Sequence, residues 1–186
     1  MERWAIPLAW LVWAAIWTAM ARDVKPVAAR IDGASQRAHY LPLALAALLL
    51  LVPIRVYPLD ARFVPLVAWP AHLGLGLVVA GIAYAVWARV RLAGNWSSDV
   101  TLKQGHELIV EGPYRWTRHP IYTGLLLAIA GTALAIGEWR GLAAVALTVV
   151  AWRRKIALEE TLLRREFGET YASYARRVKA LAPFLF

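Results

Sequence analysis

Long runs of uncharged, mostly apolar residues alternate with charged segments along this chain. Five runs contain no Asp, Glu, Lys or Arg: residues 4–21, 38–54, 63–88, 120–137 and 141–152. A helix needs about 20 residues to cross a bilayer, and the first four runs approach or exceed that length. The fifth run is shorter; it crosses if its flanking side chains reach the interface or if it continues into the next helix, and otherwise it is re-entrant. The pattern predicts an all-α, polytopic membrane protein with about five transmembrane helices.

The first run also fits a cleavable signal, because small residues occupy Ala19 and Ala21. Its length and its tryptophans favour a retained span instead.

An amphipathic C-terminal helix is expected after the last run. At helical spacing, one face of that helix carries Ile156, Leu163, Phe167, Tyr171, Tyr174 and Val178. Glu159 fills the gap in this apolar stripe, and Glu160 is its neighbour. Carboxylates in that position indicate either ordinary salt bridges to residues four positions away, Lys155 and Arg164, or a cationic ligand at the buried face.

Composition and charge strengthen the membrane interpretation. The chain is 60% apolar, contains ten tryptophans and has a formal net charge of +9. If the five runs all cross, 17 Lys and Arg residues lie on one side of the membrane and 4 on the other. The positive-inside rule then makes residues 22–37, residues 89–119 and the tail cytoplasmic. Nucleic-acid binding is not expected, because these charges flank apolar runs and match no known module.

Polar residues gather in two places, the loop 94–119 and the tail after Trp152, which both belong to the predicted cytoplasmic side. No repeat or linker divides the chain, so residues 1–186 form one domain. Residues 101–114 resemble a short hairpin or extended segment turned at Gln104 and Gly105. Pro120 suits the first turn of the fourth span, which leaves His119 at the positive end of that helix.

Several kinds of chemistry are excluded. The chain has no cysteine, and none of its four histidines (His39, His72, His106 and His119) lies three or four residues from another, so no metal site is expected. The glycines of "GLG" at 74–76 lie inside the third run, where they indicate close helix packing rather than the turn of a Rossmann fold.

Two motifs together resemble a known family. "GPYRWTRHPIYTG" (112–124), followed about 35 residues later by "EETLLRREFGETYASYARRV" (159–178), resembles the isoprenylcysteine carboxyl methyltransferase family and its prokaryotic relatives. The wider group includes membrane phospholipid N-methyltransferases. The resemblance covers about residues 94–183.

This resemblance implies a membrane methyltransferase that uses S-adenosylmethionine without a Rossmann fold and releases S-adenosylhomocysteine. The positions that match the family's cofactor site are His106, Glu107, Leu108, Ile109, Tyr114, His119, Pro120, Ile121, Tyr122, Glu159 and Glu160. Lys155, with Arg154 beside it, matches a basic position that contacts substrate in the family. We expect Lys155, Arg154 and Arg118 to orient an anionic acceptor, Glu159 to pair with the cationic donor, and Glu160 to pair with Arg118 or Arg115.

The expected partners are membrane lipids and a lipidic or prenylated acceptor, with carboxyl O-methylation favoured and phospholipid N-methylation as an alternative. A sterol-type reductase that uses NADPH is a second hypothesis, because the loop arginines could hold a 2′-phosphate. A non-catalytic membrane protein is a third. We expect the prokaryotic inner (plasma) membrane with a cytoplasmic site; no feature of the sequence indicates an oligomeric state.

Overall fold

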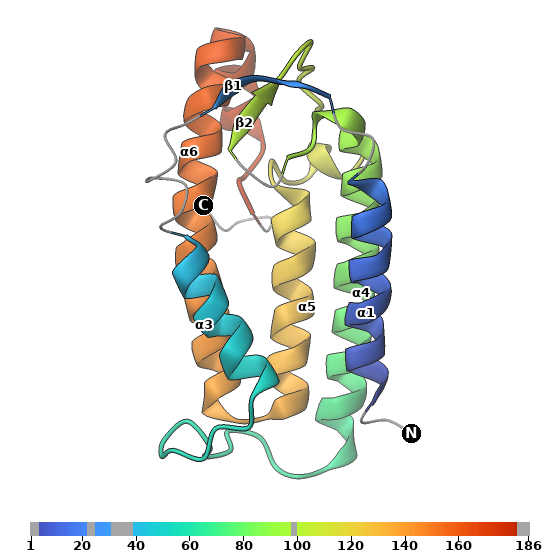
Figure 1. The fold of residues 1–186 in the computed structure, drawn as a ribbon, viewed down its shortest axis with the longest axis vertical. Coiled ribbons are helices and arrows are strands. Elements are labelled where there is room, and N and C mark those ends of the chain that lie inside the picture. The colour runs from blue at the N-terminus through green and yellow to red at the C-terminus, as the bar shows by residue number, and fades with distance from the viewer. Residues whose placement is uncertain (1–3, 22–24, 31–38, 98–99, 182–186) are drawn as a thin grey trace.

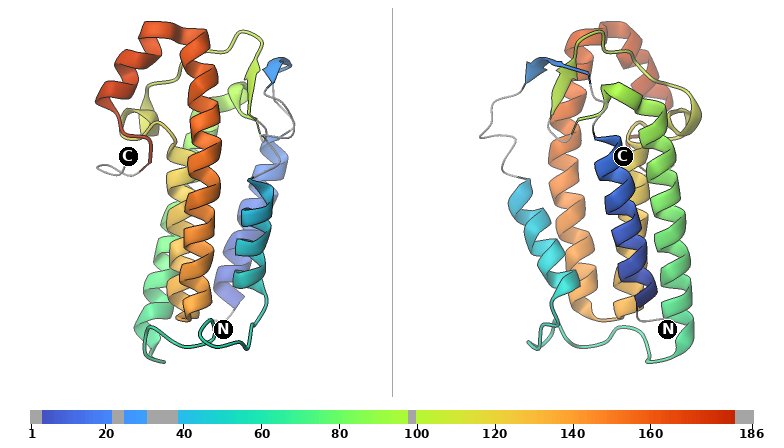
Figure 2. Two further views of the ribbon diagram at one scale, coloured as in Figure 1. Left: turned by 90° about the vertical axis from the view of Figure 1, so that its left-hand side faces the viewer. Right: turned by 45° about the vertical axis from the view of Figure 1, so that its right-hand side comes forward.

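The computed structural model describes residues 4–21, 25–30, 39–97 and 100–181. Within them, α-helices coincide with all five uncharged runs: α1 (Ala5–Met20), α3 (Tyr40–Leu51), α4 (Ala68–Leu92), α5 (Pro120–Ile136) and α6 (Trp139–Arg177). Figures 1 and 2 show these helices side by side, with the chain running alternately up and down. The predominantly helical fold agrees with the prediction.

Glycines bring α4 and α5 into the closest contact in the bundle. Gly81 and Gly74 of α4 face Gly124 and Gly131 of α5, and an added Cβ at any of the four would collide with a backbone carbonyl of the other helix. Small residues permit such an approach between membrane helices. Gly76, by contrast, is exposed and has open space around it, so only the first glycine of "GLG" serves this contact.

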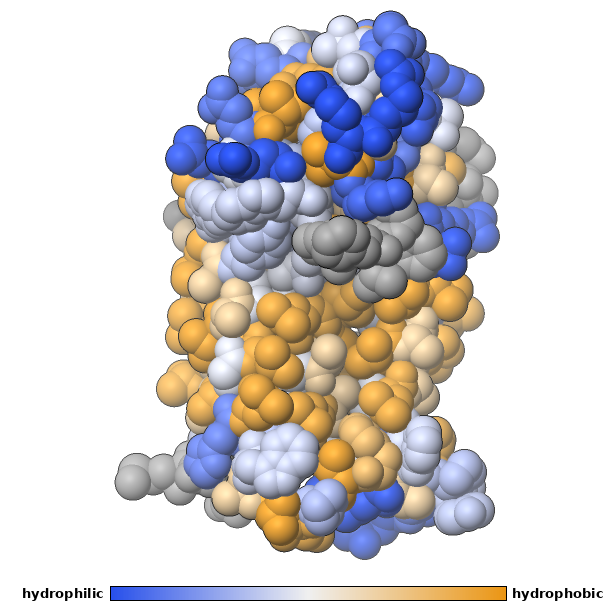
Figure 3. Space-filling view, turned by 180° about the vertical axis from the view of Figure 1, so that it is seen from behind, coloured by the Kyte–Doolittle hydropathy of each residue, from blue (hydrophilic) through white to orange (hydrophobic). Residues whose placement is uncertain are grey.

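On the face that Figure 3 shows, a broad band of hydrophobic side chains crosses the middle of the molecule, between ends that carry hydrophilic ones. Among the described residues one helix, Ala68–Asn95, is by itself long and apolar enough to cross a membrane, whereas α1, α3 and α5 are shorter apolar helices. Of the exposed tryptophans on this helix, Trp69 lies at its start and Trp87 lies about two turns before its end. They lie 18 residues apart, or about 27 Å along a helix axis, which is close to the thickness of bilayer hydrocarbon.

The tail does not continue as one straight amphipathic helix. Gly168 has φ 51° and ψ −126°, a conformation that favours glycine, and it breaks α6 into two helical segments. The second segment turns back beside the first (Figure 2). The expected single stripe from Ile156 to Val178 is therefore wrong as a continuous face, although Ile156, Tyr171 and Tyr174 are all buried.

Of the two forms expected for residues 101–114, the hairpin is wrong, whereas the turn at Gln104 and Gly105 is present. Strand β2 (Thr101–Lys103) pairs antiparallel with β1 (Val27–Arg30), a segment from the loop after α1. Gly105 takes a positive φ, as expected for a turn, but the chain after it does not return as a strand. The partner of β2 lies more than 70 residues away along the sequence, a distance at which local pattern carries little information.

Candidate active site

The loop before α5 and the end of the tail are joined through their backbones. The amide of Arg118 donates to the carbonyl of Lys179 at 2.8 Å, and the amide of His119 donates to Ala180 at 2.9 Å. The Arg118 side chain strengthens the joint, because its guanidinium donates to the carbonyls of Ala175 and Val178. The tail that folds back at Gly168 thus fixes the segment from which α5 begins at Pro120.

Two glutamates of α6 enclose the imidazole of His119. Nδ1 of His119 lies 3.5 Å from Oε2 of Glu159, and Nε2 lies 3.3 Å from Oε1 of Glu160. Arg118 holds Glu160 from the other side, with Nη2 2.6 Å from Oε1. The hydroxyl of Tyr122, one turn into α5, donates to Oε1 of Glu159 at 2.6 Å. Of the two partners expected for Glu160, the structure selects Arg118.

The charges of this cluster stabilise one another. Burial alone would raise the pKa of the Glu160 carboxyl, but hydrogen bonds from His119 and Arg118 lower it to about 2. The pKa of Glu159 is also below its usual value, because contacts with His119 and Lys155 outweigh its burial. The pKa of His119 is raised, since its hydrogen bonds to both glutamates outweigh desolvation. The arrangement favours two carboxylates with an imidazolium between them.

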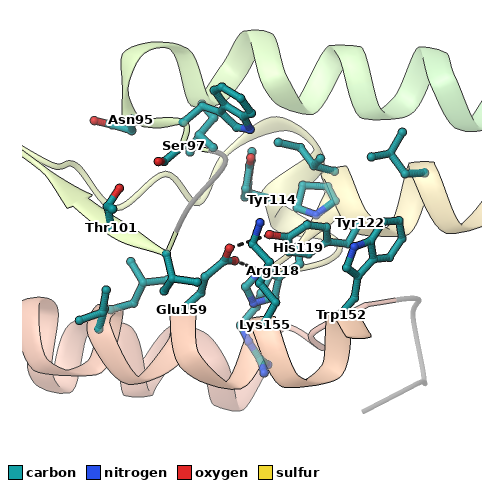
Figure 4. A pocket seen from close by; sticks show the side chains of 18 of the residues that line it. Asn95, Ser97, Thr101, Tyr114, Arg118, His119, Tyr122, Trp152, Lys155 and Glu159 are labelled. Atoms are coloured by element: carbon teal, nitrogen blue, oxygen red, sulfur yellow. Dashed lines mark hydrogen bonds and ion pairs between the residues drawn. The ribbon is translucent and has the colours of Figure 1, made fainter. Parts of the chain in front are cut away.

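A pocket of about 320 Å³ opens beside this cluster. Figure 4 shows Glu159, Lys155 and Trp152 on α6 facing Tyr114, His119 and Tyr122, with Asn95, Ser97 and Thr101 toward one end. Nine of the residues expected at the site line it: His106, Tyr114, Arg118, His119, Pro120, Ile121, Tyr122, Lys155 and Glu159. The volume falls in the range of small-molecule sites.

Four of the residues expected at the site do not line the pocket, and a fifth supports the pocket from outside. Arg154 is exposed on the outer side of α6, because one position along a helix turns a side chain by about 100° from that of Lys155. Glu107, Leu108 and Ile109 are absent from the pocket wall; Ile109 instead packs against the main apolar core. Glu160 does not line the pocket but supports His119 and Arg118, which do.

Lys155 is a buried cation in the pocket wall. Its side chain is 8% exposed, and its ammonium lies 5.6 Å from the centre of the Tyr122 ring. The same ring lies 5.2 Å from that of Trp152. An ammonium with this limited access to water is well suited to bind an anion that enters the pocket.

The pocket also uses residues that sequence reasoning missed. Trp13 and Trp17 of α1 line it, together with Asn95 and Trp96 just after α4. The four-residue spacing of the two tryptophans predicts that they share a helix face. No local pattern indicates that this face turns toward the chemistry of α5 and α6.

The fold and the site define a predominantly helical membrane protein with a charged pocket at one end of its bundle. The model of the isoprenylcysteine carboxyl methyltransferase family matches residues 74–165, about half of the chain. Protein-S-isoprenylcysteine O-methyltransferase B of Arabidopsis thaliana is 29% identical over 75% of this chain and 74% of its own length. A probable protein-S-isoprenylcysteine O-methyltransferase of Oryza sativa subsp. indica is 33% identical over 62% of each chain.

A solved structure of the eukaryotic intramembrane Ras methyltransferase, an isoprenylcysteine carboxyl methyltransferase, has a similar fold. Its TM-score is 0.60 at 24% identity, over 83% of this chain and 54% of the other. The present chain belongs to the isoprenylcysteine carboxyl methyltransferase family, a family of integral-membrane enzymes. It spans between 43% and 74% of the length of the relatives it matches.

Proposed function

We propose that this protein is an S-adenosylmethionine-dependent membrane methyltransferase that methylates the carboxylate of a lipidic or prenylated acceptor. The observation that carries the proposal is the position of Glu159 and Lys155, one anion and one cation, one helical turn apart in the wall of the same pocket. Membership of the family and the O-methyltransferase activity for which its relatives are named support the same conclusion.

The residues of the pocket fit the methyl donor. Glu159 is held by Tyr122 and His119, and its side chain keeps 22% exposure, so it can also receive a cationic ligand. Tyr114, Tyr122 and Trp152 supply aromatic surface around it. S-adenosylmethionine carries an ammonium and a sulfonium and supplies an activated methyl group when it is bound. A carboxylate at a half-buried site attracts such a cation more strongly than one in bulk water.

Lys155 would hold the acceptor. A carboxylate is already a nucleophile, so the protein has to align it and exclude water rather than remove a proton. The Lys155 ammonium can hold one carboxylate oxygen and leave the other free to react. Lysine offers a point charge rather than the bidentate fork of arginine, which suits this single contact.

The pocket would lie at the cytoplasmic rim of the plasma membrane, with about five crossings in the bundle. It lies at the end of the molecule that also holds the described residues 25–30 and the second segment of α6 (Figure 1). In the sequence, residues 22–37, residues 89–119 and the tail hold 17 of the 21 Lys and Arg residues. Trp87 and Trp116, whose rings lie 5.6 Å apart, would mark the inner interface close to the pocket. A lipidic acceptor could then reach Lys155 from the bilayer while the soluble donor arrives from the cytoplasm.

Thermal shift in detergent tests this proposal. We expect S-adenosylhomocysteine to stabilise the protein and NADPH to have no effect. Transfer of a radiolabelled methyl group from S-adenosylmethionine to N-acetyl-S-farnesylcysteine, or to a component of a host lipid extract, should accompany the shift. Stabilisation by NADPH alone would favour the sterol-type reductase, and the absence of both shifts would favour a non-catalytic protein.

A further inference from the structure

The pocket has two unlike halves. Its charged half consists of Arg118, His119, Lys155 and Glu159. The lining also includes three indole rings, Trp13 and Trp17 of α1 and Trp96, which follows α4; we call these three residues the tryptophan wall. α1 lies outside residues 74–165, the region that matches the family model. Trp13 and Trp17 therefore lie outside the region that matches the family model, whereas Trp96 lies within it.

The tryptophan wall is the upper end of a continuous row of rings. Trp10 and Trp13 lie 5.5 Å apart, Trp13 and Trp17 lie 5.4 Å apart, and Trp17 meets Trp96 edge-on at 5.6 Å. The indole of Trp10 donates to the hydroxyl of Thr132 on α5 at 3.0 Å and fixes the lower end of the row. The row follows the axis of an apolar helix for about 10 Å, which is a suitable surface for an extended hydrocarbon chain.

Arg89 holds this row in place from behind. It is 1% exposed, near the end of α4. Its Nη2 donates to the carbonyl of Met20, the last residue of α1, at 2.6 Å, and its Nη1 donates to the carbonyl of Ala93 at 2.7 Å. Its guanidinium also lies 4.6 Å from the centre of the Trp96 ring. One side chain thus connects the end of α1, the end of α4 and the tryptophan wall.

The turn that carries Trp96 needs such a restraint. Ala93 has φ 48°, a region that residues with a side chain rarely adopt, and this conformation costs of order 1–3 kcal/mol unless its surroundings impose it. The hydrogen bond from Arg89 to the Ala93 carbonyl holds the chain in that conformation. The planar guanidinium suits the task because it can donate in two directions and stack on a ring at once.

We propose that the tryptophan wall is the subsite for the apolar tail of the methyl acceptor, and that Arg89 is the positioning residue that fixes the wall opposite Lys155. The inference rests on the proposed function. With the acceptor carboxylate at Lys155, its tail can leave the charged half in one favourable direction, along the rings of α1 toward the hydrocarbon of the bilayer. Burial against indole rings also removes the tail from water.

Kinetics with N-acetyl-S-farnesylcysteine test the subsite. We expect Trp13→Ala and Trp17→Ala to raise the KM for this probe by about tenfold, while the affinity for S-adenosylhomocysteine stays within about twofold, because Glu159 is untouched. Arg89→Ala should give the same pattern. Arg89→Lys should rescue little, since one ammonium cannot reproduce the fork that reaches both carbonyls.

Arg140 offers a matched control. It is also buried, at 8% exposure, and also joins two helices, since it donates from α6 to the carbonyls of Leu49 and Val52 at 2.7 and 3.0 Å. It lies at the opposite end of the bundle. Arg140→Ala should lower thermal stability as Arg89→Ala does, yet leave the KM for the farnesylated probe unchanged. Equal effects of the two variants on KM would overturn the positioning role.

Two further results separate this inference from the proposed function. If Trp17→Ala weakens S-adenosylhomocysteine and spares the acceptor KM, the wall holds the adenine of the donor and the tail subsite is refuted. A farnesylcysteine with a benzophenone in its tail reports binding without turnover, and its crosslinks should map to α1. Crosslinks found only on other helices would overturn the subsite, whereas failure of the wild-type protein to bind S-adenosylhomocysteine would refute the function itself.

Discussion

At the scale of single residues, the two adjacent glutamates of α6 differ in how far other side chains already engage them. Glu159 already accepts a hydrogen bond from Tyr122 and faces His119, and it still opens onto the pocket. Glu160 has a different task, because Arg118 and His119 both contact its Oε1, while Arg164 lies 3.7 Å from its Oε2. Adjacent glutamates on one helix therefore divide the work: Glu159 is available to a ligand, and Glu160 attaches the helix to the loop before α5.

Replacing Glu159 by glutamine should lower the affinity for S-adenosylhomocysteine by about tenfold or more, since the change removes a charge-assisted contact at almost constant shape. Isothermal titration calorimetry in detergent measures the effect. Glu166→Gln, an exposed change on the same helix with the same loss of charge, serves as the control and should bind normally. Unchanged affinity in the Glu159 variant would remove this residue from the donor site.

Lys155 and Arg154 allow a more specific test, because these two neighbouring cations differ in burial. We expect Lys155→Ala to lower turnover by at least about tenfold, because the acceptor loses the charge that orients it, while donor affinity changes little. Arg154→Ala should leave both quantities nearly unaffected, as that side chain is exposed and outside the pocket. Methyl-transfer kinetics combined with donor binding distinguish the two, and a collapse of donor binding in the Lys155 variant would contradict its assignment to the acceptor.

His119 makes stability depend on pH. Its pKa is raised in the folded state by both glutamates, so its contribution is complete below the usual value of about 6.5 and is lost as pH rises through the folded value. The unfolding temperature in detergent should therefore fall above pH 6.5, by about 2–4 °C for each kcal/mol lost. His119→Gln should reduce this dependence of the unfolding temperature on pH. His72→Gln, an exposed change on α4, should leave the dependence unchanged. Glu160 cannot produce the slope, because its pKa of about 2 keeps it charged throughout.

At the scale of elements, the contact between α4 and α5 sets the frame for the pocket. Gly81→Ala should destabilise the protein, because its new methyl group would meet the backbone of Gly124 and Ala128, and overpacking of this kind costs about 1–3 kcal/mol. Gly76→Ala is the matched change on the same helix, where nothing lies within 4 Å of the added carbon. Thermal unfolding in detergent should show a loss for the first variant and none for the second. Equal midpoints would mean that the helices can separate without cost.

Elements that follow from local chemistry were predictable from the sequence. The uncharged runs located the helices, Pro120 marked the start of α5, and the interrupted stripe around Glu159 indicated the face that meets His119. Features that depend on distant partners were not. The break at Gly168, the pairing of β1 with β2, and the approach of Trp13 and Trp17 to the pocket each depend on contacts between segments far apart in the chain.

Which of Lys155 and Arg154 faces the pocket was only partly predictable from the sequence. Helical phase places only one of two adjacent residues on the pocket face, but the sequence does not fix that phase to within one residue. The structure resolves it, because Lys155 shares its face with Trp152 and Glu159 at steps of three and four.

At the scale of the whole molecule, function requires the charged pocket and the bilayer to meet at one end of the bundle. The helices alternate in direction, so the loop after α4 and the tail after α6 lie at the same end, and the loop between α3 and α4 lies at the other (Figure 1). Under the proposed function, this arrangement would let a soluble donor reach the pocket from the cytoplasm and a lipidic acceptor reach it from the bilayer. The pocket and the bilayer surface meet in this way only if the apolar half of α6 crosses the bilayer completely.

Single cysteines can test that crossing without background labelling, because the chain contains no cysteine of its own. We expect Gln104→Cys and Thr170→Cys, both at exposed positions, to react with a membrane-impermeant maleimide in inside-out vesicles and to be protected in right-side-out vesicles. Val56→Cys, 59% exposed at the other end of the bundle, should show the opposite pattern. Because two helices separate residues 104 and 170, labelling of Thr170→Cys together with Val56→Cys would mean that α6 re-enters instead of crossing, and the pocket could not form at a single membrane face.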